Sequence, residues 1–274
     1  MSRINILGTG CAMVTNCFNT CFTISNNDGE HFLIDTGGGN TILNNLKAMN
    51  ISVLNIRSLF VSHTHNDHIT GISWIIRSIA VQMNKGNYQG IFTIYGEKSV
   101  IEACRTICTL TLGNKFTKHF DERIKFFPVE NNMTLNILNN EVTFFDIHST
   151  KCLQYGFKLI TEDNISLCFL GDEPYREILK QYAENCDFLM HEAFCLYEER
   201  EIFSPYEKHH STVKECSENA EMLNAKNLII IHTMDNDVAN RKTYYCAEAD
   251  YFCKCNVIMP DDMEVIELTH NDNE

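Results

Sequence analysis

The segment Val61–His68, VSHTHNDH, constrains this chain more than any other, because it places three histidines and an aspartate within six residues. The residues before it, Ile56–Val61, are apolar and bounded like a buried strand. The residues after it, Ile69–Met83, repeat isoleucine at helical spacing. The sequence therefore predicts that the histidines lie on a turn from a strand into a helix.

The spacing within this cluster indicates two metal ions rather than one. His63 and His65 are two residues apart, so on an extended backbone their side chains point the same way. Asp67 and His68 are adjacent and can reach a different point. Imidazole nitrogens and carboxylate oxygens are the ligands of catalytic zinc, which keeps one position open for water. Two such ions, about 3.5–4 Å apart, can hold a hydroxide and both oxygens of a displacement.

Residues of the same chemistry follow four apolar segments further along the chain. The segments are Val142–Phe145, Ile165–Leu170, Asp187–Met190 and Leu228–Ile231, and they are followed by His148, Asp172, His191–Glu192 and His232. In α/β sheets, sites lie at the carboxyl ends of the strands. Any one of these residues alone is an ordinary polar residue leaving a sheet. Together they predict a convergent site.

These residues supply enough ligands for two ions. The predicted ligands are His63, His65 and His148 for the first ion, Asp67, His68 and His232 for the second, and Asp172 as the bridge. Taken alone, His148 or His232 is more often a satisfied core histidine. The cluster at Val61–His68 is what favours ligation.

A second pair of residues is suited to acid catalysis. His210 precedes a helix expected at 213–223, whose start, Thr212–Glu215, has the pattern of a capping box. Helix N-termini stabilise anions. If Glu192 holds one ring nitrogen, His210 keeps a proton on the other and can act as a general acid. The alternative is that His210 only decorates the cap.

The remaining elements are predicted less sharply. Strands are expected at 4–7, 21–24, 31–34, 91–95 and 125–129, with helices at 40–49 and 99–110. A hairpin turn is expected at 26–29. The glycine-rich loop 35–39 fits a phosphate cradle and a simple turn equally well. The rest of 114–140 has no clear pattern.

Composition indicates a single domain, 1–274, with 44% hydrophobic residues. The net charge of −14 makes the chain a poor generic binder of nucleic acid. No signal peptide and no membrane-spanning run is found, so we expect a cytoplasmic protein that does not enter the membrane. Its 13 cysteines are then expected to be reduced, and most of them buried. Cys152, four residues after His148, is expected beside the site.

The segment Ser62–His68 resembles the HxHxDH motif of the metallo-β-lactamase superfamily. More closely, the chain resembles RNase Z, the tRNA 3′-trailer endonuclease, over most of its length. The other segments that resemble motifs of that family are Leu7–Gly10 with Asn19, Ile34–Gly37, Tyr95–Gly96, Gly171–Asp172, His191–Ala193 and His210–Thr212. Asp172 lies only 24 residues after His148, an interval without the long tRNA-binding arm that RNase Z commonly inserts there.

The resemblance implies an α/β fold, the four-layer αββα sandwich. It implies two divalent ions, zinc first and manganese or iron as alternatives, and hydrolysis of a phosphodiester by a metal-bridging hydroxide. Asp67 would act on the water, and Glu192 and His210 on the leaving oxygen. The substrate would be an RNA 3′ end or a small diester. The protein would be a homodimer, as RNase Z-like enzymes often are.

Three other functions are compatible with the same scaffold. A hydrolase of a thioester or lactone would not need the acid pair Glu192 and His210, because its leaving group is good. A redox protein with two irons usually has a carboxylate where His65 stands. A non-catalytic binding protein would be expected to have lost ligands, and every expected ligand is present.

Overall fold

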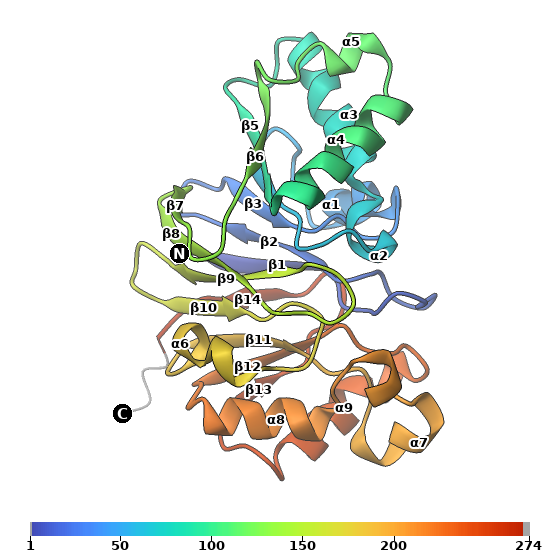
Figure 1. Ribbon diagram of the computed structural model, residues 1–274, viewed down its shortest axis with the longest axis vertical. Helices are drawn as coiled ribbons and strands as arrows, with labels where there is room; N and C mark the ends of the chain where they lie inside the picture. Colours follow the sequence, from blue (N-terminus) through green and yellow to red (C-terminus); the bar gives the residue numbers. More distant parts are fainter. Residues whose placement is uncertain (1, 271–274) are drawn as a thin grey trace.

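Two β-sheets lie face to face, and helices cover the outer face of each (Figure 1). The computed structural model describes residues 2–270. The first sheet runs in the order β14 (Val265–Glu267), β1 (Arg3–Gly8), β2 (Cys21–Ser25), β3 (His31–Ile34), β4 (Ile56–Phe60), β5 (Phe92–Gly96) and β6 (Ile124–Pro128). The second runs in the order β13 (Asn256–Ile258), β12 (Asn227–Ile231), β11 (Phe188–Glu192), β10 (Ser166–Phe169), β9 (Tyr155–Ile160), β8 (Asn140–Asp146) and β7 (Thr134–Ile137).

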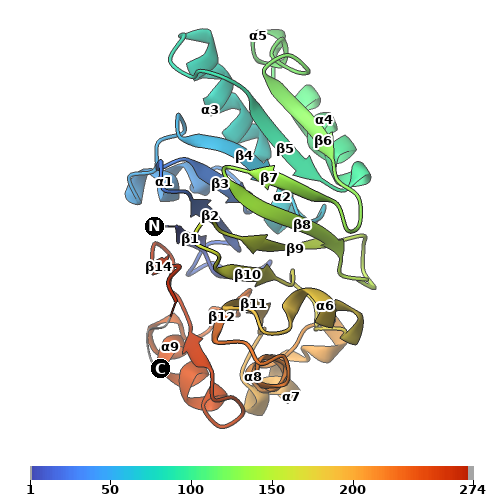
Figure 2. The same cartoon turned by 90° about the vertical axis from the view of Figure 1, so that its left-hand side faces the viewer.

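The helices divide between the two sheets. Those on the side of the first sheet are α1 (Thr41–Ala48), α2 (Asn66–Ile69), α3 (Ile72–Asn84), α4 (Lys98–Thr111) and α5 (Asn114–Thr117). Those on the side of the second are α6 (Lys180–Ala183), α7 (Arg200–Phe203), α8 (Val213–Met222) and α9 (Val238–Ala249). Figure 2 shows the same layers from the side, with α3 and α4 at one end and α8 and α9 at the other. The predicted αββα sandwich is confirmed.

Alternation along the strands builds three apolar layers. In β3, Phe32 and Ile34 face the second sheet, whereas Leu33 packs under the helices of the first. This is the two-residue period of a strand buried on both faces. The inner layer holds a cluster of aromatic rings around Phe157, whose centroid lies 5.8 Å from that of Phe60.

Strand direction decides where the site forms. Strands β3 to β6 of the first sheet are parallel to one another, and so are β10 to β13 of the second. Their carboxyl ends therefore meet at one edge of each sheet, as the sequence predicted. The hairpin between β2 and β3 is also confirmed, since these strands pair antiparallel.

Two regions differ from the sequence-based expectations. The helix expected at 69–83 is found as α3, which begins three residues later, at Ile72; Ile69 ends α2, and Thr70 and Gly71 separate the two helices. A Cβ on Gly71 would lie 2.1 Å from the carbonyl oxygen of Thr36, so this turn packs directly on the neighbouring loop. Within 114–140, the strand expected at 125–129 is found as β6, whereas α5 and β7, of four residues each, are too short to give a periodic signal. Within residues 2–270, no helix has the length and apolarity that crossing a membrane requires.

Candidate active site

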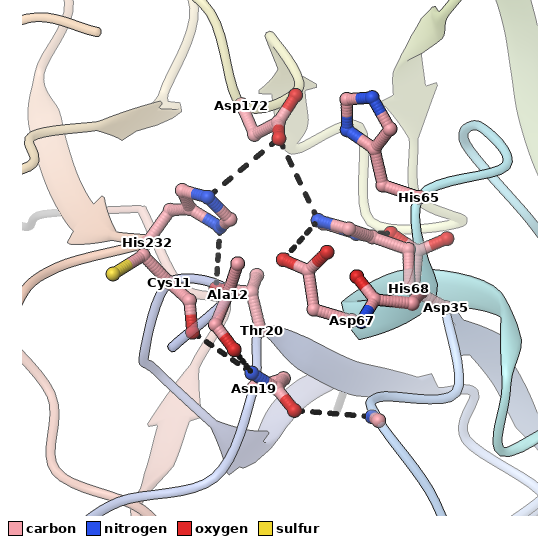
Figure 3. A network of polar contacts seen from close by, with 12 residues as sticks. Cys11, Ala12, Asn19, Thr20, Asp35, His65, Asp67, His68, Asp172 and His232 are labelled. Carbon is pink, nitrogen blue, oxygen red and sulfur yellow. Dashed lines mark hydrogen bonds and ion pairs between the residues drawn. The ribbon is translucent and has the colours of Figure 1, made fainter. Parts of the chain in front are cut away.

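The loops after β4, β10 and β12 bring histidines and aspartates together where the two sheets meet. Figure 3 shows Asp172, His68 and His232 pointing toward one another, with Asp67 beside His68. All four side chains are buried. Asp172 follows β10, His232 follows β12, and the other two lie in α2. Each of the two sheets thus contributes to one polar centre.

One oxygen is the common point of this centre. The Oδ2 atom of Asp172 lies 3.6 Å from the Nε2 atoms of His63, His68 and His232. These separations exceed hydrogen-bond length. They match instead the spacing of about 3.3 Å expected between ligand atoms around a tetrahedral ion with bonds of about 2.0–2.1 Å. Within the described chain, the buried Nε2 atom of His68 has no hydrogen-bond partner. The residues present therefore fit a bound cation.

Residues 2–270 contain three groups of potential metal ligands, and within each group the ligand atoms lie within 4.8 Å of one another. They are Asp67 with His68 and His232, His63 with His68 and Asp172, and His63 with His65 and Cys152. The first group is the set that the sequence predicted for the second ion. The second group places Asp172 between the two predicted positions.

The structure does not bring His148 into any of these groups. Its side chain is 42% exposed, and its Nδ1 atom lies 3.8 Å from Oδ2 of Asp146. His63 and His65 do meet, with Nε2 and Nδ1 2.9 Å apart. The atom that joins them is the sulfur of Cys152. Ligation by His148 stays a prediction that this geometry does not favour.

Neighbouring side chains orient the histidines. Asp35 accepts a hydrogen bond from Nδ1 of His68 over 2.7 Å, so that the Nε2 atom of His68 faces the centre. The hydroxyl of Ser62 is 3.0 Å from Nδ1 of His63 and 2.7 Å from Asp35. Sequence reasoning missed the role of Asp35, although Asp35 also follows a strand end, that of β3. Such outer contacts fix the tautomer and direction of a ligating imidazole.

The pKa shifts leave most side chains of the centre in the protonation state that binds a metal ion, with neutral imidazoles and an ionised carboxylate. Burial lowers the pKa of His63 and lowers that of His232 to about 3, so both rings are neutral. Burial raises the pKa of Asp172, but His63 and the other rings outweigh it and hold this pKa well below its usual range. His68 differs: burial lowers its pKa, but Asp67, Asp35 and Asp172 together outweigh burial and raise this pKa well above its usual value. A bound cation would displace that proton, since ligands must be deprotonated.

The predicted acid pair is also brought together. The Nδ1 atom of His210 lies 3.4 Å from Oε2 of Glu192, and both residues are buried. The other oxygen of Glu192 accepts from the backbone N–H of Ser211 over 2.5 Å. Phe194 stacks on the imidazole of His210, with ring centroids 4.9 Å apart and planes 5° apart. The ammonium of Lys151 lies 3.3 Å from Nε2 of His210. These contacts hold His210 beside the histidine centre, 5.4 Å from the ring of His232.

Comparisons with known proteins agree with this fold. A curated Ribonuclease Z of Thermococcus sibiricus is 25% identical over 311 residues, covering 98% of this chain and 97% of the relative. The metallo-β-lactamase fold protein YhfI from Bacillus subtilis superposes with a TM-score of 0.79 at 18% identity, over 97% of this chain and 98% of that one. The short form of human tRNase Z gives a TM-score of 0.73 at 19% identity, over 98% and 100%.

The sandwich and its neighbours define the class of this protein, which has the metallo-β-lactamase fold. The resemblance to that superfamily and to RNase Z, drawn from the sequence, is confirmed. The names of the relatives support a hydrolase of this superfamily. Residues 2–240 match the family described as Anti-Pycsar protein Apyc1, and the chain belongs to that family.

Proposed function

We propose that this protein is a metal-dependent phosphodiesterase with a dinuclear centre, most simply of zinc, with manganese or iron as alternatives. The observation that carries the proposal is the approach of three imidazole nitrogens to one oxygen of Asp172. Two of these imidazoles are neutral, and a bound cation would displace the proton of the third. Three such nitrogens around one carboxylate oxygen suit a pair of ions that share this oxygen. The similarity to a protein named Ribonuclease Z supports a phosphodiester as the substrate.

Two bound ions would supply hydroxide from water at neutral pH and offset negative charge on the phosphoryl oxygens. The side chains of the chain perform the remaining steps. Asp67 lies 3.3 Å from Nε2 of His68 in this centre and would accept a proton from the attacking water. His210 donates a proton to the leaving oxygen, while Glu192 holds its other nitrogen.

The surroundings of the site favour a small diester over RNA. The net charge of −14 opposes the counterion release that drives binding to a long polyanion. The interval between His148 and Asp172, where RNase Z commonly inserts its tRNA-binding arm, holds instead the antiparallel strands β9 and β10. A short turn at 161–165 joins them. Lys151, 3.3 Å from His210, is placed to contact one phosphoryl oxygen.

The test compares two substrates with one metal-analysed preparation. One reaction contains a pre-tRNA with a 3′ trailer, and the other bis(p-nitrophenyl) phosphate. We expect cleavage of the small diester and none of the trailer. Asp172→Ala protein, purified in parallel, controls for contaminating nucleases. Trailer cleavage by the wild-type protein alone would make RNA the substrate. No cleavage of either by protein that carries two ions would overturn the proposal.

A further inference from the structure

The loop 149–154 brings a cysteine, Cys152, to the position predicted for the first ion, beside His63 and His65. The sulfur of Cys152 lies 3.6 Å from Nε2 of His65. It also falls within 4.8 Å of the ligand atoms of His63 and His65. His63 is fully buried, and Cys152 is half-buried. A donor set of two imidazoles and one thiol is therefore assembled at the edge of the centre.

We propose that Cys152 is a thiolate ligand of the ion held by His63 and His65. This inference rests on the proposed function, because it requires an ion at that position. Imidazole nitrogens and cysteine thiolates are both zinc ligands, and a catalytic zinc takes three protein ligands and keeps its fourth position open. On binding, the S–H bond of Cys152 breaks, a metal–sulfur bond forms, and the proton leaves to solvent.

The backbone holds Cys152 toward the centre. The hydroxyl of Ser149 donates to Glu173 over 2.6 Å, and the backbone N–H of Thr150 donates to the same carboxylate over 3.2 Å. The backbone N–H of Cys152 donates to the hydroxyl of Ser149 over 3.3 Å. Glu173 is buried and directly follows Asp172. The segment that carries the bridging carboxylate thus also fixes the loop that carries the thiol.

His148 is held by different contacts. Its backbone N–H donates to Oδ1 of Asp146 over 2.7 Å, and its backbone has φ = +57°. Its ring is 42% exposed and stands near the carboxylate of Asp146. These contacts leave the third place beside His63 and His65 to Cys152.

An independent observation, at His68, also indicates that this centre binds a cation. Among residues 2–270, Nε2 of His68 has no hydrogen-bond partner, and it lies 3.6 Å from Oδ2 of Asp172. Its ring is 4.2 Å from that of His63, between centroids. The thiol is therefore not an isolated cysteine, because it borders a centre that contains a buried nitrogen without a hydrogen-bond partner, Nε2 of His68.

Cobalt absorption tests the sulfur ligand directly. The full-length protein is stripped of metal, loaded with two equivalents of Co²⁺, and its spectrum recorded. We expect a near-ultraviolet sulfur-to-cobalt charge-transfer band in the wild-type protein. In Cys152→Ser protein this band should vanish while visible cobalt bands persist, and affinity for the first ion should fall at least about tenfold. In His148→Ala protein the band and two bound ions should remain.

The matched control addresses the other thiols. Cys253 and Cys255 lie 3.1 Å apart, between sulfurs, and are the pair most able to bind cobalt elsewhere. Cys253→Ser should therefore leave the band unchanged. Two bound cobalt ions without a sulfur band, or a band that survives Cys152→Ser, would overturn the inference alone. Wild-type protein that binds no cobalt at all would instead overturn the proposed function.

Discussion

The bridging role of Asp172 depends on a single oxygen atom that three imidazoles approach. We expect Asp172→Ala to lose bound metal and to reduce diester hydrolysis by more than about 100-fold, because both ions lose a shared ligand. Metal content per chain and the rate with bis(p-nitrophenyl) phosphate measure the two effects. Asp163→Ala, on the exposed turn between β9 and β10, is the control. Unchanged turnover in Asp172→Ala would end the dinuclear proposal.

The role of His210 is separable from metal binding. If it protonates the leaving oxygen, His210→Ala should slow hydrolysis of an alkyl diester about 10²–10⁴-fold and that of a p-nitrophenyl diester far less. The ratio of the two rates is the measurement. His209→Asn is the matched control, because His209 is exposed and has φ = +58°, which asparagine tolerates. Equal slowing of both substrates would show that His210 is not the acid.

His31 makes stability depend on pH at a position away from the site. Burial lowers the pKa of His31 below its ordinary value of 6.5. Below pH 6.5 the unfolded chain binds a proton that the folded chain does not, so folding stability falls as pH falls. We expect a loss of up to about 1.4 kcal/mol per pH unit from this group.

Urea unfolding of metal-free protein at several pH values between 7.5 and 5.5 checks this expectation. His31→Gln removes the group and keeps a partner for the hydroxyl of Thr23, which lies 3.0 Å from Nδ1 of His31. The stability of this variant should fall less steeply with pH than that of the wild-type protein. Parallel curves for the two proteins would contradict the assignment.

The strands position the site through the rings packed between the sheets. Phe157 on β9 contacts Phe32, Phe60 and Phe169, with centroids 6.1, 5.8 and 5.5 Å away. Phe157→Ala should cost about 3–5 kcal/mol of unfolding free energy, because the cavity spans both sheets. Denaturant unfolding measures it. Phe127→Ala, whose ring is 40% exposed, should cost much less. Similar losses for both variants would mean that the inner layer is not the main core.

Local geometry in short elements decides which side chains reach the centre. The turn between α2 and α3 packs Gly71 against the carbonyl of Thr36, which lies next to Asp35. His68 lies in α2, just before this turn, and its backbone carbonyl accepts from the N–H of Thr36 over 2.8 Å. Asp35 and His68 are thereby held together across 33 residues of sequence.

At the scale of the whole molecule, the centre joins the two sheets. His63 and His65 follow β4 in the first sheet, and Asp172 and His232 follow β10 and β12 in the second. Metal binding should therefore stabilise the entire fold, by about 4 kcal/mol at a free metal concentration 1,000 times the dissociation constant. The homodimer and the single domain stay predictions.

Removal of metal tests this stabilisation. Dialysis against EDTA should lower the melting temperature, and adding back Zn²⁺ or Mn²⁺ should restore it. The same treatment should leave Asp172→Ala protein almost unchanged, since that variant is expected to bind metal poorly. A wild-type melting temperature that does not respond to EDTA or to added metal would contradict a centre that links the sheets.

Several features of the fold could be predicted because their causes are local. The two-residue period of buried strands and the helical spacing of isoleucines depend only on residues that are close in the sequence. The burial of the cysteines was also predicted: nine of the thirteen are buried, as expected for small apolar side chains. The approach of Glu192 to His210 could also be expected, because Glu192 ends β11 and His210 shortly precedes α8, two elements with a clear signal.

By itself, the sequence determined most of the strands that carry the site, the polar residues at their ends and the ligand-type side chains of the segment Ser62–His68. Only the tertiary structure decided which distant groups meet. The orientation of His68 by Asp35, the stacking of Phe194 on His210 and the approach of Cys152 in place of His148 all depend on loop paths. Periodicity fixes the direction of a side chain within a helix or strand. It does not fix the path of a loop, which long-range contacts such as those of Glu173 set.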